Sequence, residues 1–148
     1  MCTEMFKGCT SLIKGPKVLP SYVLENSYQS MFEGCTSLIT APDLPALELA
    51  ENCYYHMFME CTSLTKAPDL PAPILVAGCY TGIFQYCSNL NYIKILTIEI
   101  ASGRPISYWA YGVADTGTII KKKEFDMIEG DISSDYEGYP KGWTVINI

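Results

Sequence analysis

Hydrophobic positions recur along the first two thirds of the chain at a fixed spacing of 26 residues. Copies of the pattern Met-Phe-x-Gly-Cys-Thr-Ser-Leu, exact or varied, begin at Met5, Met31, Met57 and Ile83. The phenylalanines of the copies are in register without a gap: Phe6, Phe32, Phe58 and Phe84. A period of this length indicates one supersecondary unit per repeat, stacked so that neighbouring units share a core. The sequence therefore predicts a repeat architecture.

Each repeat is expected to hold one short helix and one short strand. Apolar residues follow one another at four-residue steps, which is typical of one buried helical stripe: Leu49, Cys53, Met57 and Cys61. The segment after each Phe-x-x-Cys, such as 62–66, is rich in β-branched and apolar residues and predicts a strand. Stacked units of this kind give a parallel sheet with short helices on its opposite side.

Two prolines bracket one leucine between successive copies, in 42–46 and 68–72 and more loosely in 16–20. Proline lacks an amide donor and fixes its own backbone angle, so these segments are predicted as corners. The predicted fold class is an α/β repeat solenoid, a leucine-rich-repeat-like stack of short strand plus short helix with a 26-residue period.

The chain divides into an array and an ending. Residues 1–98 are predicted to form four rungs, the first of them incomplete, and residues 99–148 a C-terminal capping segment over the last rung's apolar face. The chain begins inside a repeat, which leaves two expectations open. It is a piece of a longer repeat protein, or another molecule covers its N-terminal rung.

Six of the seven cysteines lie in two repeat columns: Cys9, Cys35, Cys61 and Cys87 in one, and Cys53 and Cys79 in the other. Placement by the period alone indicates a packing role, with cysteine as a small buried hydrophobe. Parallel Cβ vectors in one column fit poorly with the dihedral of about 90° that a disulfide needs. Disulfides remain the less favoured alternative. A zinc site is not expected, because the chain has one histidine and no C-x-x-C pair.

Charge and motifs exclude several classes of function. A net charge of -6 argues against nucleic acid, which needs a basic stripe. The run Lys121 to Lys123 is followed at once by Glu124 and is expected to be a solvated loop, with an anionic contact as the alternative. Prolines and polar residues interrupt the longest uncharged stretch, so membrane insertion is not expected. The first residues lack the features of a secretory signal.

Catalytic signatures are not found in the sequence. It contains no G-x-S-x-G, H-E-x-x-H or Walker-type loop, so no enzyme activity, cofactor or metal is expected. Asp131, Ser133, Asp135 and Glu137 have the alternate spacing of a calcium loop, but Tyr136 replaces the required glycine and Gly142 the closing glutamate. An ordinary acidic turn is the preferred interpretation.

Candidate binding residues are those that the repeat leaves free to vary. One column ends each predicted strand: Lys14, Thr40, Lys66 and Tyr92. A second set lies on the predicted helices and includes Tyr55 and His56, the latter at a position expected to be solvated. Exposed tyrosine offers a large, rigid contact with a polar tip. Tyr28, Tyr54 and Tyr80 are instead expected to form a half-buried column.

The motif M-F-x-G-C-T-S-L, followed by A-P-x-L-P-A and C-Y-x-x-M-F, resembles the BspA-like class of leucine-rich repeats over residues 1 to 98. The ending, with Trp109-Ala110-Tyr111-Gly112 and Gly142-Trp143-Thr144-Val145, is also similar to endings of such arrays. These repeats occur in surface proteins of gut and oral anaerobic bacteria and of some protists. The resemblance implies an extracellular or cell-surface, adhesin-like module that binds a host or microbial surface protein or glycan.

Two classes of function follow. The first is a non-enzymatic protein-protein or protein-glycan binding module of a surface or secreted protein, in which Lys66 and Tyr92 matter. The alternative is a structural or assembly subunit that self-associates through its N-terminal rung, in which Met1 and Met5 matter, or a module on the surface of a phage particle.

Overall fold

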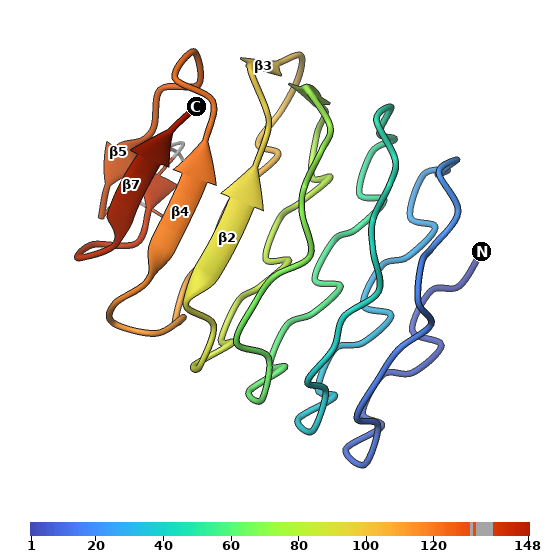
Figure 1. The fold of residues 1–148 in the computed structure, drawn as a ribbon. Helices are drawn as coiled ribbons and strands as arrows, with labels where there is room; N and C mark the ends of the chain where they lie inside the picture. The colour runs from blue at the N-terminus through green and yellow to red at the C-terminus, as the bar shows by residue number, and fades with distance from the viewer. Residues whose placement is uncertain (131, 133–137) are drawn as a thin grey trace.

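Successive segments of the chain run alongside one another in the computed structural model, which describes residues 1–130, 132 and 138–148 (Figure 1). Isolated parallel bridges join Lys14 to Thr40 and Lys66 to Tyr92, each 26 residues further on. We call these segments rung 1 (1–25), rung 2 (26–51), rung 3 (52–77) and rung 4 (78–102). Each rung has a run of turns on one side and an extended segment on the other.

All named strands are short and pair in parallel. Strand β1 (Ile74–Leu75) pairs with β3 (Glu99–Ile100), and β5 (Ile128–Glu129) pairs with β6 (Gly138–Tyr139). The largest sheet has the order β2-β4-β7, formed by β2 (Tyr92–Ile95), β4 (Thr118–Lys121) and β7 (Thr144–Asn147) (Figure 1). Tyr92 pairs with Thr118 and Thr118 with Thr144, so the 26-residue register continues through the C-terminal part.

The predicted α/β solenoid of the leucine-rich-repeat kind is wrong. The described residues contain no helix, and their strands are short and lie in small parallel sheets. None of the described segments forms a helix that could span a bilayer. The predicted strand and the predicted corner of a repeat also have each other's structure. Thr62 and Ser63 lie in a turn, whereas Leu70, in a predicted corner, forms a parallel bridge with Ile95.

Consecutive turns replace the predicted helix. Asn26, Ser30 and Gly34 have positive φ angles of 55°, 51° and 72°, and a residue in this left-handed region every fourth position interrupts right-handed winding. The Gln29 amide donates to the Asn26 carbonyl of the same rung, whereas the Ser30 amide donates to the Tyr55 carbonyl of the next. A turn repeat of four residues produces nearly the same apolar spacing as a helix of 3.6. The apolar spacing of four residues therefore did not distinguish a repeat of turns from a helix.

Aromatic side chains stack in two columns through the core. Phe32, Phe58 and Phe84 are fully buried, with ring centroids 5.5 and 5.9 Å apart. In the second column the Tyr54 ring lies 5.8 Å from Tyr28 and 6.0 Å from Tyr80. This column is buried rather than half-buried as predicted. Identical side chains in register thus fill the interior from rung to rung.

Buried cysteines add hydrogen bonds between rungs. The Sγ atoms of Cys35, Cys61 and Cys87 lie 3.0, 3.2 and 2.9 Å from the carbonyl oxygens of Phe6, Phe32 and Phe58 of the preceding rung. Burial raises the pKa of the Cys87 thiol to about 12. From rung 2 onward the column therefore needs a side chain that is small, apolar and able to donate one weak hydrogen bond. Cys9 of rung 1 is exposed, so the buried packing role predicted for it is wrong.

Indole groups fix the C-terminal part. Trp109 is fully buried and donates its Nε1–H to the Gly138 carbonyl at 2.8 Å, and Trp143 donates to the Ala114 carbonyl at 2.8 Å. Lys121, expected in a solvated loop, is buried. Its ammonium group donates to the Phe125 carbonyl at 2.7 Å. The basic run is therefore partly structural.

Replacing Phe58 by alanine is expected to lower the free energy of unfolding by about 3 to 5 kcal/mol, because it removes a ring stacked on both sides and leaves a cavity. Urea unfolding followed by circular dichroism measures the change. Leu47→Ala is the matched control, because Leu47 is 60% exposed and its loss should cost under about 0.5 kcal/mol. Equal losses in the two variants would contradict the stacked core.

Cysteine reactivity is expected to follow burial. Iodoacetamide at pH 8 should modify the exposed Cys9 in the folded chain, because the thiolate is the reacting species and burial disfavours it. Burial raises the pKa of Cys53 to about 11 and of Cys79 to about 12. These two thiols should become reactive only on unfolding. Peptide mass spectrometry reads out each site, and early labelling of Cys79 would refute the buried column.

Candidate functional site

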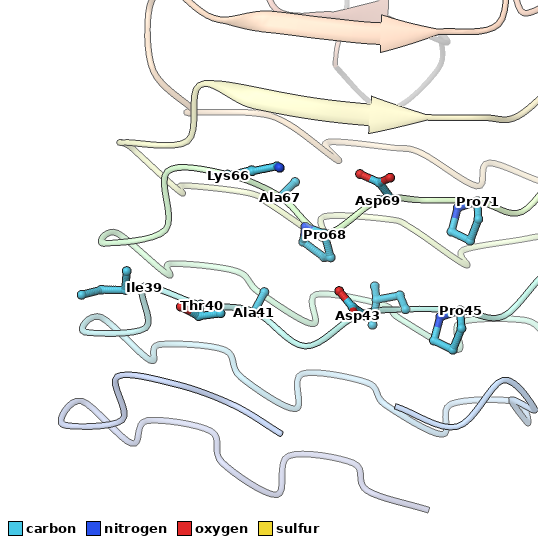
Figure 2. A pocket seen from close by; sticks show the side chains of 11 residues that line it. Ile39, Thr40, Ala41, Asp43, Pro45, Lys66, Ala67, Pro68, Asp69 and Pro71 are labelled. Atoms are coloured by element: carbon cyan, nitrogen blue, oxygen red, sulfur yellow. The ribbon is translucent and has the colours of Figure 1, made fainter. Parts of the chain in front are cut away.

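An open groove of about 600 Å³ lies between the extended segments of rungs 2 and 3. Its lining comes from residues between 39 and 45 on one side and between 66 and 71 on the other. Figure 2 shows the two segments facing each other across this space, with Thr40 and Asp43 on one segment and Lys66 and Asp69 on the other.

Backbone hydrogen bonds are present on the outer side of each groove segment. On rung 2, the Asp43 amide donates to the Lys17 carbonyl of rung 1 at 3.0 Å. On rung 3, the Leu70 amide donates to the Lys94 carbonyl of rung 4 at 2.9 Å. Within the described residues, no backbone hydrogen bond joins the two groove segments to each other. We call this interruption the open seam.

Four backbone amides face the open seam. Thr40 and Asp43 donate to rung 1, and Ala67 and Leu70 donate to rung 4. Adjacent amides of an extended chain point to opposite sides, so the amide next to each of these donors is directed toward the seam. The amides in question are those of Ala41, Leu44, Lys66 and Asp69, and none has a partner among the described residues.

Prolines reduce the number of amide donors on both sides of the seam. Pro42 and Pro45 lie in one groove segment, and Pro68 and Pro71 in the other. Proline cannot donate to a ladder and is confined in sheets to edges, strand starts and bulges. Rung 1 also carries two prolines, Pro16 and Pro20, and it pairs with rung 2 through the Lys14–Thr40 and Val18–Asp43 bridges, so prolines remove donors without by themselves excluding pairing. Rung 4 has no proline in 91–100 and supplies a regular partner for rung 3.

The charged side chains at the groove differ in whether they have an interaction partner. The Asp69 carboxylate lies 3.1 Å from the Lys94 ammonium on the outer side of rung 3. The Lys66 ammonium lies over the Tyr92 ring, 5.0 Å from its centroid. The exposed Asp43 carboxylate has no ion pair among the described side chains. Asp43 is thus the groove charge available to a ligand.

The predicted strand-end column is brought together in two pairs. Lys14 lies beside Thr40, and Lys66 lies beside Tyr92, each pair joined by a parallel bridge. The open seam separates the two pairs, and Thr40 and Lys66 line opposite sides of the groove. Lys14, Thr40 and Lys66 are exposed and Tyr92 is half-buried, so this column remains a candidate binding surface.

Tyr55 and His56 are not part of this groove. They lie in the turn run of rung 3, and their rings stack at 4.0 Å between centroids. His56 is half-buried, and burial lowers the pKa of its imidazole. It has a φ of 53°, as Ser30 and Gly82 have positive φ at the equivalent positions. The imidazole is therefore half-buried in a turn run, and it is not the solvated side chain of a helix that the sequence predicted.

Sequence reasoning missed Asp43 and Asp69. Each is an exposed acid between two prolines, in 42–45 and 68–71, and this pattern was interpreted only as a corner. The acid repeated within both proline-bracketed segments was the available signal, because a corner does not require a charged residue at that position.

Another exposed feature is a cluster of three tyrosines on the turn side. The Tyr111 ring lies edge-on to Tyr86 at 5.7 Å and to Tyr108 at 5.8 Å. Tyr86 and Tyr108 both have positive φ, which is uncommon for an aromatic residue.

The positions considered for a calcium loop, Asp131, Ser133, Asp135 and Glu137, lie outside the described residues. Elsewhere in the described chain, no group of three or more His, Cys, Asp or Glu side chains is arranged to hold a metal ion.

Comparisons with family models, with curated proteins and with solved structures give no match for this chain.

The packing of His56 against rung 4 can be tested with glycine variants. Gly82 and Gly8 both have positive φ, but a Cβ on Gly82 would clash with the His56 ring, whereas a Cβ on Gly8 meets open space. Gly82→Ala is expected to lose about 1 to 3 kcal/mol more stability than Gly8→Ala, by overpacking. Thermal unfolding gives the difference.

A second substitution checks the cause. His56→Gly removes the ring and suits the positive φ, so the Gly82→Ala, His56→Gly double variant should recover the excess loss. If the additional loss of stability persists in the double variant, the His56 imidazole is not the group that clashes with the new methyl group.

Proposed function

We propose that this chain is a non-enzymatic binding module that holds a surface protein or glycan on its extended face. The observation that carries the proposal is the open seam, where backbone amides without partners line a groove beside Thr40, Lys66 and Tyr92. Exposed main-chain donors together with a cation and an aromatic ring are groups that recurrently make binding contacts. No residue in this role needs to perform acid or base chemistry.

The BspA-like resemblance of the repeat motif supports the same proposal. Proteins with such repeats are similar to adhesins, so the proposed setting is extracellular or the cell surface. The ligand is proposed to be a host or microbial surface protein or glycan. In this proposal the stacked core provides a rigid support, and the variable strand-end column provides specificity.

Assembly through rung 1 is a second candidate, favoured by one observation. Met5 is 56% exposed, whereas its counterpart Met31 in rung 2 is buried. Sedimentation velocity of Met5→Glu against Thr3→Glu separates the candidates. Assembly requires self-association of the parent chain that Met5→Glu abolishes and Thr3→Glu retains, whereas a binding module requires neither.

The binding proposal predicts saturable binding to at least one member of a panel of immobilised mucin, fibronectin, fibrinogen and a glycan array. A Lys66→Glu, Tyr92→Ala variant should bind at least about tenfold more weakly, because it reverses the cation and removes the ring beside the groove. Surface plasmon resonance measures the affinities. Lys123→Glu, an exposed charge reversal in the C-terminal part, is the matched control and should leave binding unchanged. Undiminished binding by the double variant would move the site elsewhere, and no binding to any panel member would count against the module.

A further inference from the structure

We propose that the open seam binds an extended peptide by strand addition, with a basic side chain of that peptide paired to Asp43. The inference rests on the proposed function and specifies the ligand class. It requires three things of the seam: backbone groups that lack partners, a spacing that a regular strand can match, and a charge that selects the peptide. Each is present in the described residues.

The first requirement is met by the seam amides of Ala41 and Leu44 on rung 2 and of Lys66 and Asp69 on rung 3. None has a partner among the described residues. Unpaired edge groups of this kind are the template on which an extended chain adds as a strand. A peptide backbone would supply the carbonyl acceptors that these amides require.

The second requirement is met by a precedent within the fold. On the outer side of rung 3, the Ala67 and Leu70 amides, three residues apart across Pro68, donate to the carbonyls of Tyr92 and Lys94 on β2, two residues apart. The proline-bracketed segment therefore presents donors at the spacing of alternate carbonyls of a regular strand. Lys66 and Asp69 are also three residues apart across Pro68 and face the seam. Strand β2 thus serves as a model for the proposed occupant.

The third requirement is met by the charges around the seam. Asp69 is engaged by Lys94 at 3.1 Å, and the Lys66 ammonium lies over the Tyr92 ring. Asp43 is exposed and has no ion pair among the described side chains. The net charge of the chain is -6, which favours the approach of a basic ligand. An arginine or lysine on the peptide would complete the pairing.

A glycan fits the same groove less well. Sugar hydroxyls can accept hydrogen bonds from the seam amides, but a pyranose does not present carbonyls at the repeat of a strand. A neutral glycan also leaves the Asp43 carboxylate without a counter-charge. The peptide is therefore the ligand that uses all three features of the seam.

A titration monitored by nuclear magnetic resonance tests the inference on the full, ¹⁵N-labelled chain. The probe is the acetylated and amidated peptide Thr-Val-Thr-Arg-Thr-Val-Thr, which has high strand propensity and one central cation. We expect saturable shifts of the Ala41, Leu44, Lys66 and Asp69 amide signals. A peptide with glutamate in place of arginine should bind at least about tenfold more weakly.

Variants of the chain complete the test. Asp43→Asn should weaken binding of the arginine peptide about tenfold, with seam amides still shifting at saturation. Glu48→Gln, an exposed acid outside this groove, is the matched control and should bind as the parent does. Equal affinity for the arginine and glutamate peptides, or shifts confined to the turn side, would overturn the inference.

The failure of this inference is distinguishable from failure of the proposed function. Binding to the mucin, fibrinogen, fibronectin or glycan panel that depends on Lys66 and Tyr92, without peptide shifts at the seam, overturns strand addition alone. Such binding confined to glycans would assign the groove to sugars. No binding in the panel and no shifts in the peptide titration would overturn both proposals.

Discussion

Backbone hydrogen bonds between the turn runs of neighbouring rungs are the interaction on which the rest of this structure depends. The Phe32 and Phe58 amides donate to the carbonyls of Met57 and Ile83 of the next rung, both at 2.9 Å. The Phe84 amide donates to the carbonyl of Trp109, in the segment after rung 4, at 2.8 Å. These bonds fix one rung against the next at a constant register. The aromatic columns and the cysteine hydrogen bonds follow, because equivalent side chains are then held within contact of one another.

Continuity on the turn side permits interruption on the extended side. Rungs 2 and 3 remain joined through turn-run bonds such as that from Ser30 to Tyr55, and through the bond from Ser63 to the Thr36 carbonyl. The extended segments of the same rungs can therefore leave backbone groups unpaired without separating the rungs. A groove formed in this way has a rigid base and polar edges, which is a favourable arrangement for a binding surface. The prolines on both sides of the seam limit uncontrolled edge pairing.

From rung 2 onward, the apolar positions of the 26-residue pattern are buried as a shared core requires, but the secondary structure could not be predicted from the sequence. Leu38, Leu64 and Leu90, the last residues of three copies of the repeated motif, are fully buried. The helix prediction failed because a four-residue turn repeat and a helix place apolar residues at nearly equal steps. The positive φ positions gave a partial signal, since Asn26, Gly34 and Asn52 are residue types that accept left-handed backbone, but His56 and Tyr86 concealed it.

The candidate site, too, could be predicted from the sequence only in part. By itself the sequence determined the 26-residue register and the column of Lys14, Thr40, Lys66 and Tyr92, because stacked repeats place equivalent positions side by side. Only the tertiary structure decided that this column is split by an open seam, with Asp43 and the amides of Ala41 and Lys66 at its edges. Hydrogen-bond pairing depends on which neighbour each extended segment meets. That choice is made when the rungs pack and not within any one repeat.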